Sequence, residues 1–509
     1  MQDCRSCETT KQSVASVGGK ILFDHNIINY NNIRKEANMK KTKIICTMGP
    51  NTIDRECLKQ LALNGMNIAR LNFSHNEYDY QEKLINLIKD VREELNLPIA
   101  ILLDTKGPEI RVGKLKNDKI TLVEGTEVTL TTMEVEGDEA LIPITYQDLP
   151  KDVTEGNHIL MDDGLLELVV KACTDTTIIC SVLAGGELSS KKGVNVPNVR
   201  VNLPAITEKD KEDIAFGIEH DIDFIAASFV RNAEAITEIK KILKAHHAED
   251  ISVIAKIENR EGVDNMDEIL AEADGIMVAR GDLGVEIPAQ EVPFVQKELI
   301  QKCNRAYKPV ITATQMLDSM MRNPRPTRAE VTDVANAIYD GTDAIMLSGE
   351  TAVGKYPVDS VKMMAEIAEA TEEHLNYELH MKKKKMKQNM DVSNAVAFSS
   401  VATASNVGAK YILASSISGG TARVVSKYRP ECHIIGLSPV EKTLRKMQIF
   451  WGVTPMRTKH VAHTDEILTL AIDTVKDAKL VKDGDVVVVT AGSVYGDHAV
   501  TSMMKVFII

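Results

Sequence analysis

The chain has 509 residues, which exceeds one ordinary hydrophobic core and predicts several domains. An apolar content of 44% and a charged content of 26% are typical of a soluble globular protein. A net charge of -13 and an aromatic content of 4% argue against a general nucleic-acid binder. No apolar run reaches the roughly 20 residues that span a bilayer, so we expect neither a nucleic-acid nor a membrane partner.

Residues 1–38 show no apolar segment of a signal peptide and are expected to be an extension of unknown role. Eight cysteines in a chain of this length are not the density of a disulfide scaffold, which predicts the reducing cytoplasm. Cys4 and Cys7 have CxxC spacing, but no second pair follows at zinc-ribbon distance. A fortuitous pair is therefore favoured over a metal site.

From Met39 onward, short runs rich in Val, Ile, Leu and Ala recur, and each ends in polar residues. They span 42–49, 67–74, 100–107, 223–229, 252–259, 275–282, 309–316 and 344–350. Between most of them lie stretches with helical periodicity, such as 54–64 and 264–273. This alternation predicts parallel strands covered by helices, and eight such units predict a closed (β/α)8 barrel.

The alternation of strands and helices is interrupted between residues 107 and 223, where Thr-, Val- and Gly-rich stretches predict a small antiparallel β domain. Inserted after the third barrel strand, it lies where a lid over an active site would sit.

We interpret the lysine run 382–385 as a solvated linker rather than a nucleic-acid signal. The predicted domains are the barrel (39–107 and 204–370), the β lid (108–203), a linker (371–389) and a C-terminal α/β domain (390–509) with strands at 411–416, 433–438 and 485–492.

Polar residues gather where the predicted barrel strands end. Catalytic groups of barrel enzymes lie at the carboxyl ends of the strands. Each residue alone is better explained as a surface ion pair or a strand cap, but together they favour a catalytic site. They are Arg70, Asn72, Ser74, Asp104, Thr105, Ser228, Lys256, Glu258, Arg280, Asp282, Thr314 and Ser348.

The residue types suggest the chemistry of this cluster. Glu258 and Asp282 supply hard oxygen ligands suited to Mg²⁺. Lys256 and Arg70 offer cations for a transferring phosphoryl group. A second oxygen cage with one negative charge suits a monovalent cation, and its members are Asn72, Ser74, Asp104 and Thr105.

Long motifs from about Met39 to the end resemble those of the pyruvate kinase family. They are ARLNFSH (69–75), DTKGPEIR (104–111), KIEN (256–259), MVARGDLGVEIP (277–288), ATQMLDSM (313–320), PRPTRAE (324–330) and IMLSGETA (345–352). The resemblance implies a catalytic barrel, an inserted β-barrel lid, a C-terminal regulatory domain and a cytoplasmic homotetramer. It also implies transfer of the phosphoryl group of phosphoenolpyruvate to ADP, the last step of glycolysis, with Mg²⁺ (or Mn²⁺) and K⁺.

The resemblance also implies residue roles. Lys256 stabilises the phosphoryl group in flight, and Arg70 contacts the substrate phosphate. Glu258 and Asp282 hold the divalent metal, whereas Asn72, Ser74, Asp104 and Thr105 match the potassium ligands. Thr314 matches the residue near C3 of the enolate, where a proton must arrive, and Ser348 matches part of a proton relay. Asn72, Arg111 and Lys192 resemble nucleotide contacts, and Glu109 resembles the potassium-dependent branch of the family.

The tripeptide Arg280-Gly281-Asp282 would suggest cell adhesion on an exposed loop of a secreted protein, but the sequence supports neither exposure nor secretion. Asp282 is instead expected to face the metal. The amides of Gly281 and Asp282, opening a short helix, are expected to bind the substrate carboxylate. Arg280 is expected to be a structural ion-pair partner.

A hydroxyl- and Gly-rich turn in the C-terminal domain resembles the effector phosphate site of the family. The alternative is a helix N-cap with a Gly turn. In the later loop 496–502, Asp497 and Ala499 argue against tight fructose 1,6-bisphosphate binding, which leaves open a monophosphate, a nucleotide or no effector. The residues of the turn are Ser415, Ser416, Ser418, Gly419, Gly420 and Thr421.

Two other functions remain alternatives. An aldolase-like lyase could use the same barrel, but the lid, Lys256 and the oxygen cage speak against it. A non-enzymatic binding protein would be expected to have lost Lys256, Glu258 or Asp282, and all three are present.

Overall fold

The computed structural model describes residues 40–74, 77–379, 381, 391–461, 463–492 and 500–509. The predictions for residues 1–38, the CxxC pair, the lysine run 382–385 and the two loop residues Asp497 and Ala499 lie outside these described residues. No helix in the described ranges is both long and apolar enough to cross a membrane.

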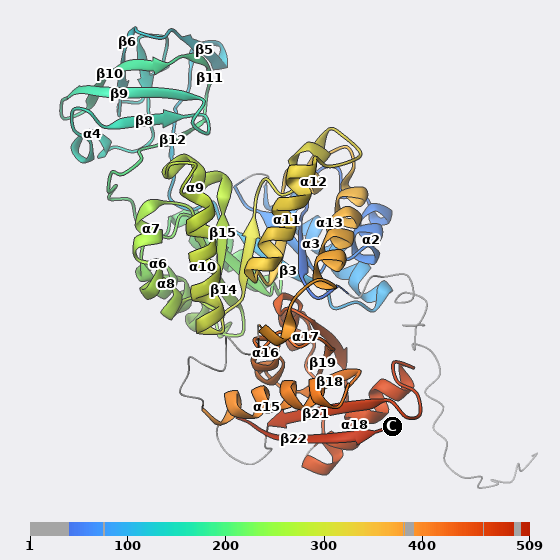
Figure 1. Cartoon of the computed structure of the whole chain (residues 1–509). Helices are drawn as coiled ribbons and strands as arrows, with labels where there is room; N and C mark the ends of the chain where they lie inside the picture. The colour runs from blue at the N-terminus through green and yellow to red at the C-terminus, as the bar shows by residue number, and fades with distance from the viewer. Residues whose placement is uncertain (1–39, 75–76, 380, 382–390, 462, 493–499) are drawn as a thin grey trace, which may run out of the picture.

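Eight parallel strands close into a barrel in the order β1, β17, β16, β15, β14, β13, β3, β2 (Figure 1). Each strand lies inside one of the eight predicted runs, which confirms the predicted barrel. The strands are β1 (Lys43–Thr47), β2 (Ile68–Asn72), β3 (Ala100–Asp104), β13 (Phe224–Ala227), β14 (Ser252–Ile257), β15 (Gly275–Ala279), β16 (Val310–Ala313) and β17 (Ala344–Leu347).

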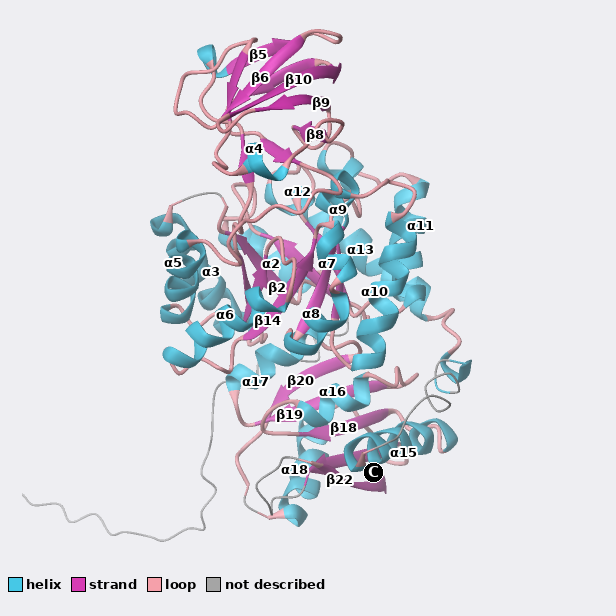
Figure 2. Cartoon of the chain, turned by 90° about the vertical axis from the view of Figure 1, so that its left-hand side faces the viewer, coloured by secondary structure: helices cyan, strands magenta, loops and turns pink. Residues whose placement is uncertain are grey.

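Helices cover the outside of the barrel (Figure 2), because alternate strand residues face outward and pack on the apolar faces of the helices. The other strand residues fill the interior, with Ile45, Leu102 and Ile254 among them. The helices are α2 (Arg55–Leu63), α3 (Tyr78–Leu95), α5 (Glu208–Glu219), α6 (Ala233–Ala245), α7 (Arg260–Asp264), α8 (Met266–Glu272), α9 (Arg280–Glu286), α10 (Val292–Ala306), η2 (Asp318–Met321), α11 (Arg328–Asp340), α12 (Gly349–Ala352) and α13 (Pro357–Glu372).

Two predicted helices show how local capping sets the boundaries. Helix α2 begins after Asp54, whose carboxylate accepts a 2.9 Å hydrogen bond from the Cys57 amide, in agreement with the prediction for 54–64. The helix predicted for 264–273 is confirmed as α8, which spans Met266–Glu272, and a separate short helix, α7, ends at Asp264 just before it. Between them, the Asn265 side chain donates to the Arg231 carbonyl at 2.9 Å, which ties the break to the loop after β13.

The inserted segment forms a curled β domain with its own apolar core, set beyond α9 in Figure 1. Seven strands are ordered β4, β12, β8, β9, β10, β6, β7, and β11 pairs with β5. Most pairs are antiparallel, as predicted, although β6 and β7 are parallel. The elements are β4 (Ile110–Arg111), η1 (Lys116–Asp118), β5 (Lys119–Leu122), β6 (Glu127–Thr131), β7 (Leu141–Pro143), α4 (Leu149–Asp152), β8 (His158–Met161), β9 (Leu166–Cys173), β10 (Thr177–Ala184), β11 (Gly186–Ser189) and β12 (Gly193–Asn195).

The C-terminal domain is a five-stranded sheet in the order β20, β19, β18, β21, β22, with helices on both faces (Figure 2). Strand β22 is antiparallel to β21 and the other pairs are parallel. The elements are α15 (Val392–Asn406), β18 (Tyr411–Ser415), α16 (Gly420–Ser426), β19 (His433–Ser438), α17 (Glu441–Lys446), η3 (Met447–Ile449), β20 (Val453–Arg457), α18 (Thr464–Asp477), β21 (Val486–Gly492) and β22 (Thr501–Ile508).

Candidate active site

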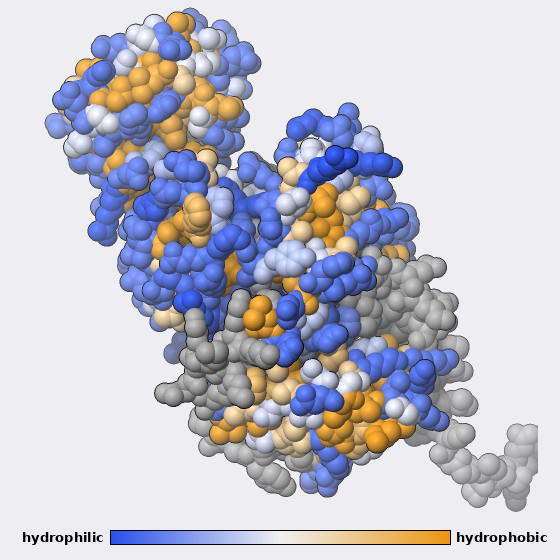
Figure 3. All heavy atoms as spheres, in the orientation of Figure 1, coloured by the Kyte–Doolittle hydropathy of each residue, from blue (hydrophilic) through white to orange (hydrophobic). Residues whose placement is uncertain are grey.

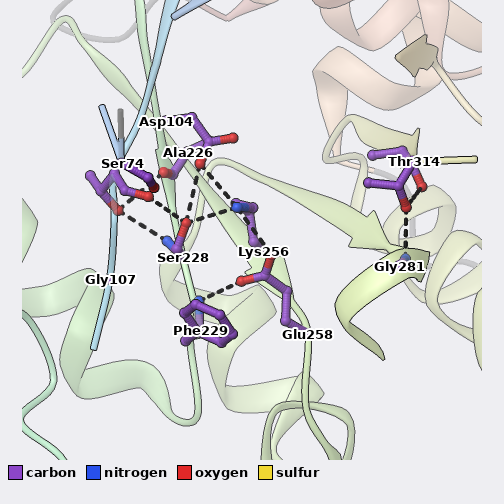
Figure 4. Close-up of polar contacts among 12 residues, drawn as sticks. Ser74, Asp104, Gly107, Ala226, Ser228, Phe229, Lys256, Glu258, Gly281 and Thr314 are labelled. Carbon is purple, nitrogen blue, oxygen red and sulfur yellow. Dashed lines mark hydrogen bonds and ion pairs between the residues drawn. The ribbon is translucent and has the colours of Figure 1, made fainter. Parts of the chain in front are cut away.

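Lys256 lies at the centre of a buried ionic cluster at the carboxyl ends of the barrel strands (Figure 4). Its ammonium is 2.9 Å from Asp104 Oδ1, 3.0 Å from Glu258 Oε1 and 2.7 Å from Ser228 Oγ. Burial lowers the pKa of Lys256, but the carboxylates of Asp104 and Glu258 outweigh burial and raise it above its ordinary value. The side chain is therefore a fixed cation at neutral pH.

Arg70 provides the second cation of this cluster. Its Nε is 2.6 Å from Asp104 Oδ2, and its Nη1 donates to Thr47 Oγ1 at 2.8 Å. Asp104 is 1% exposed, and although burial raises its pKa, Arg70 and Lys256 lower it below the ordinary value. One ionised carboxylate thus holds both cations in place.

Glu258 and Asp282 form the carboxylate pair of the site. Glu258 is 1% exposed, and its Oε2 accepts a 2.6 Å hydrogen bond from the Phe229 amide. Burial raises the pKa of Glu258 to about 7, with Lys256 opposing this and Asp282 adding to it. Two carboxylates that repel each other fit a divalent cation, because Mg²⁺ is usually held by one or two carboxylates with waters and phosphate oxygens. No cluster of three His, Cys, Asp or Glu residues with metal-binding geometry exists within the described ranges.

The ends of β15, β16 and β17 bring three further predicted residues to this face. The Gly281 amide donates to Thr314 Oγ1 at 2.7 Å, and that hydroxyl donates to the Ala313 carbonyl at 2.6 Å (Figure 4). Thr314 has a φ of 67°, a left-handed conformation that costs a β-branched residue about 1–3 kcal/mol. The buried hydroxyl of Ser348 has no hydrogen-bond partner within the described part of the chain.

Arg280 is 9% exposed at its side chain and pairs with Asp333 at 2.6 Å. This confirms the expected ion-pair role. The low exposure contradicts a cell-adhesion reading of the tripeptide, which requires an accessible arginine.

The four residues of the predicted oxygen cage come from adjacent strand ends. Asn72 and Asp104 are register partners at the ends of β2 and β3. The Asn72 side chain accepts from the Ser74 amide at 3.0 Å, and Thr105 Oγ1 accepts from the Ser228 amide at 3.1 Å. The Asp104 oxygens, however, are already bonded to Arg70 and Lys256.

A cleft of about 950 Å³ separates the lid from the barrel, and Arg111, Lys192 and Asp282 line it. Arg111 is held by Glu109 at 2.5 Å and 2.9 Å, and Lys192 lies 2.7 Å from Asp162. Two of the three predicted nucleotide contacts, Arg111 and Lys192, therefore face the cleft from the lid side, each beside an acidic partner. Asn72, the third predicted nucleotide contact, lies at the end of β2.

The predicted effector residues surround the start of α16. Gly419 has a φ of 82°, which the turn requires, and α16 begins at Gly420. Thr421 Oγ1 is 2.9 Å from Thr501 Oγ1 on β22. Ser415 is the last residue of β18, and Ser416 and Ser418 follow that strand. Effector binding here stays a prediction.

Sequence reasoning missed two features of the site. Ser228 was recognised at a strand end, but its contact with Lys256 was not predicted, since a serine before a loop carries no distinctive signal. The Asn195 side chain donates to Glu286 Oε1 at 2.7 Å and connects the lid to the last residue of α9. No spacing links these two residues, which are 91 positions apart.

The fold and the site together define an enzyme on a (β/α)8 barrel, with a buried ionic cluster at the carboxyl face of the barrel and an inserted lid beyond a cleft. Residues 39–361 match the model of the pyruvate kinase barrel domain, and residues 394–507 match that of the pyruvate kinase alpha/beta domain. The chain belongs to the pyruvate kinase family, and its activity is the transfer of a phosphoryl group from phosphoenolpyruvate to ADP.

Individual relatives support this assignment over nearly the whole chain. The chain is 51% identical over 472 residues to a pyruvate kinase of Geobacillus stearothermophilus, covering 92% of this chain and 80% of that protein. It is 49% identical over 473 residues to one of Staphylococcus saprophyticus, covering 92% and 81%. A crystal structure of a pyruvate kinase from Cryptosporidium parvum superposes with a TM-score of 0.88 at 38% identity, covering 94% of this chain and 97% of that one.

Proposed function

We propose that Lys256 and Arg70 carry the phosphoryl transfer of this enzyme. The observation that supports this most is the placement of the Lys256 ammonium within 3.0 Å of Asp104, Glu258 and Ser228. These contacts hold the ammonium in one position and keep it protonated. A preorganised cation stabilises the charge on a phosphoryl group in flight. Arg70, anchored on Asp104, binds the phosphate of phosphoenolpyruvate.

Glu258 and Asp282 are the proposed ligands of Mg²⁺ or Mn²⁺, which supplies positive charge to the phosphoryl oxygens when bound. The amides of Gly281 and Asp282 open α9 and bind the substrate carboxylate. Asn72, Ser74, Asp104 and Thr105 would hold K⁺, and Asp104 also pairs with Arg70 and Lys256. Glu109, which resembles the potassium-dependent branch of the family, agrees with this requirement for K⁺.

Thr314 and Ser348 deliver the proton to C3 of the enolate that remains after transfer. Protonation is required because enolpyruvate must become pyruvate. Asn72, Arg111 and Lys192 bind ADP, the last two from the lid side of the cleft. Closure of the lid would bring them toward the barrel and exclude water.

The divalent site is tested by Mn²⁺ binding, followed by electron paramagnetic resonance, together with pyruvate formation. Glu258→Gln and Asp282→Asn are each expected to weaken Mn²⁺ binding at least about 10-fold and to lower turnover. Asp267→Asn serves as the control, since its side chain is 81% exposed on α8. Mn²⁺ binding by either site variant at the strength of the unmodified enzyme would remove that residue from the metal site.

The potassium requirement is tested separately, by turnover with saturating Mg²⁺ in the presence and absence of K⁺. We expect K⁺ to raise turnover. Turnover that is indifferent to K⁺ would retain the kinase activity but reject the proposed cage.

A homotetramer is the proposed assembly, with the turn at Ser415 to Thr421 binding a phosphorylated effector. Figure 3 shows apolar residues over the lower part of the C-terminal domain, the region where Figure 1 places β21 and β22. On β22, Ile508 is 76% exposed and Val506 is 38% exposed, and on α10 Phe294 is 74% exposed. Such apolar surfaces favour contacts between subunits. Analytical ultracentrifugation tests this, and a single monomeric species at micromolar concentration would reject it.

A further inference from the structure

Arg280 is attached to the segment that carries Thr314. Its Nη2 donates to the Thr314 carbonyl at 2.7 Å and to the Met316 sulfur at 2.9 Å, and its Nε donates to the Ala313 carbonyl at 3.3 Å. The guanidinium thus bonds to three residues of the chain that leaves β16.

The other side of the guanidinium is fixed to two helices. Its Nη1 is 2.6 Å from Asp333 Oδ2 on α11 and 3.4 Å from Gln296 Oε1 on α10. Each nitrogen of the side chain therefore donates to a protein acceptor. This arrangement leaves Arg280 engaged in the scaffold rather than directed at a ligand.

The segment held in this way has a conformation that needs external support. Thr314 and the following Gln315 have φ angles of 67° and 53°, in the left-handed region that non-glycine residues rarely adopt. Strained backbone persists where surrounding contacts determine it. Two contacts fix the Thr314 hydroxyl, at the Gly281 amide and the Ala313 carbonyl, and Arg280 fixes the backbone beneath it.

We propose that Arg280 is a positioning residue that sets the placement of the Thr314 hydroxyl for proton delivery at C3. The inference rests on the proposed role of Thr314. Arginine is required because its planar fork reaches the carbonyls and Asp333 at once, whereas a lysine ammonium keeps the charge but not the fork. Arg280 precedes Gly281 and Asp282, so one short segment both binds substrate and orders the end of the neighbouring strand β16.

The experiment compares Arg280→Lys and Arg280→Gln with Thr314→Val, which removes the hydroxyl and keeps the β-branched shape, by two measurements. The first is the steady-state kcat and the KM for phosphoenolpyruvate. The second is the exchange of the C3 hydrogens of pyruvate with deuterated water, followed by NMR with Mg²⁺, K⁺ and ATP present. Arg322→Lys is the matched control, because its side chain is 68% exposed and pairs with Asp318, four residues away, at 3.0 Å.

We expect both Arg280 variants to lose about 10- to 100-fold in kcat and in C3 exchange, because small misplacements of a reacting group cost this much. The KM for phosphoenolpyruvate should change less than about 3-fold, since Arg280 does not touch the substrate. Thr314→Val should also slow exchange, because it lacks the hydroxyl, and Arg322→Lys should match the unmodified enzyme.

The outcomes separate the two proposals. Normal exchange in Thr314→Val would reject the role of the Thr314 hydroxyl itself. Slow exchange in Thr314→Val with normal exchange in folded Arg280→Lys would overturn the positioning role alone. A loss in Arg280→Lys that disappears when rates are expressed per folded molecule, measured by circular dichroism, would also overturn it.

Discussion

Four charged side chains at the carboxyl face of the barrel are tolerated because each lies beside a charge of opposite sign. Asp104 and Glu258 are both 1% exposed, and Lys256 and Arg70 are both 9% exposed. Removal of one member would leave an uncompensated buried charge, which typically costs about 3–5 kcal/mol. The residue types and their strand-end positions could be predicted from sequence. The pairing through Ser228 and the left-handed backbone of Thr314 could not, because they depend on the tertiary contacts of several strands.

Glu369 provides a prediction about pH at this scale. Burial raises the pKa of Glu369 on α13 to about 7, with Glu372 adding to it and Lys40 opposing it. A raised pKa means that the folded state binds the proton more tightly than the unfolded state does, so protonation of Glu369 stabilises the fold. This stabilisation is present below the ordinary pKa of 4.5 and is lost as the pH rises through about 7.

Glu369→Gln should therefore raise the melting temperature at pH 8 and have little effect at pH 5. The gain should be at most about 1 kcal/mol, because solvent screens a partly exposed group. Differential scanning calorimetry at both pH values measures this. A larger gain at pH 5 than at pH 8 would contradict the assigned direction.

At the scale of elements, the eight strands could be predicted because each is a short apolar run followed by polar residues. The break between α7 and α8 could not, since it depends on the bond from Asn265 to the Arg231 carbonyl. The contact between Asn195 on β12 and Glu286 on α9 could not be predicted from the sequence either. It connects the lid strand that follows Lys192 to helix α9, whose first turn contains Gly281 and Asp282.

Asn195→Ala tests whether this contact couples the lid to the barrel. Loss of one hydrogen bond of about 1 kcal/mol should raise the KM for ADP about 5-fold, with a smaller effect on the KM for phosphoenolpyruvate. Glu187→Gln is the control, since its side chain is 66% exposed on β11 and pairs within the lid with Lys119. An unchanged KM for ADP in the Asn195 variant would show that the contact does not govern nucleotide binding.

At the scale of the whole molecule, ion pairs help to join the C-terminal domain to the barrel. Arg445 on α17 lies 2.6 Å from Asp223 and 2.7 Å from Asp221, and Lys442 lies 2.7 Å from Asp221. Asp223 is 0% exposed and also accepts from the Ile101 amide at 2.9 Å. Sequence periodicity predicted both domains, but periodicity carries no information about which surfaces of two domains meet.

Arg445→Leu should destabilise the enzyme by about 3–5 kcal/mol, because Asp223 would remain buried without its cation. Calorimetry should show a lower melting temperature. Arg457→Leu is the control, with a side chain that is 69% exposed and paired with Glu441, and it should stay within about 0.5 kcal/mol. Equal effects of the two substitutions would contradict the importance of the domain interface.

The measurement that tests the central claim most directly is pyruvate formation from phosphoenolpyruvate and ADP by the Lys256→Ala variant. Lys211→Ala is the control, since its side chain is 45% exposed and pairs with Glu208 on the surface of α5. With folding verified by circular dichroism, the Lys256 variant should lose at least about 100-fold in turnover, because its fixed cation is gone. Turnover within about 3-fold of the unmodified enzyme would contradict the role assigned to this lysine in phosphoryl transfer.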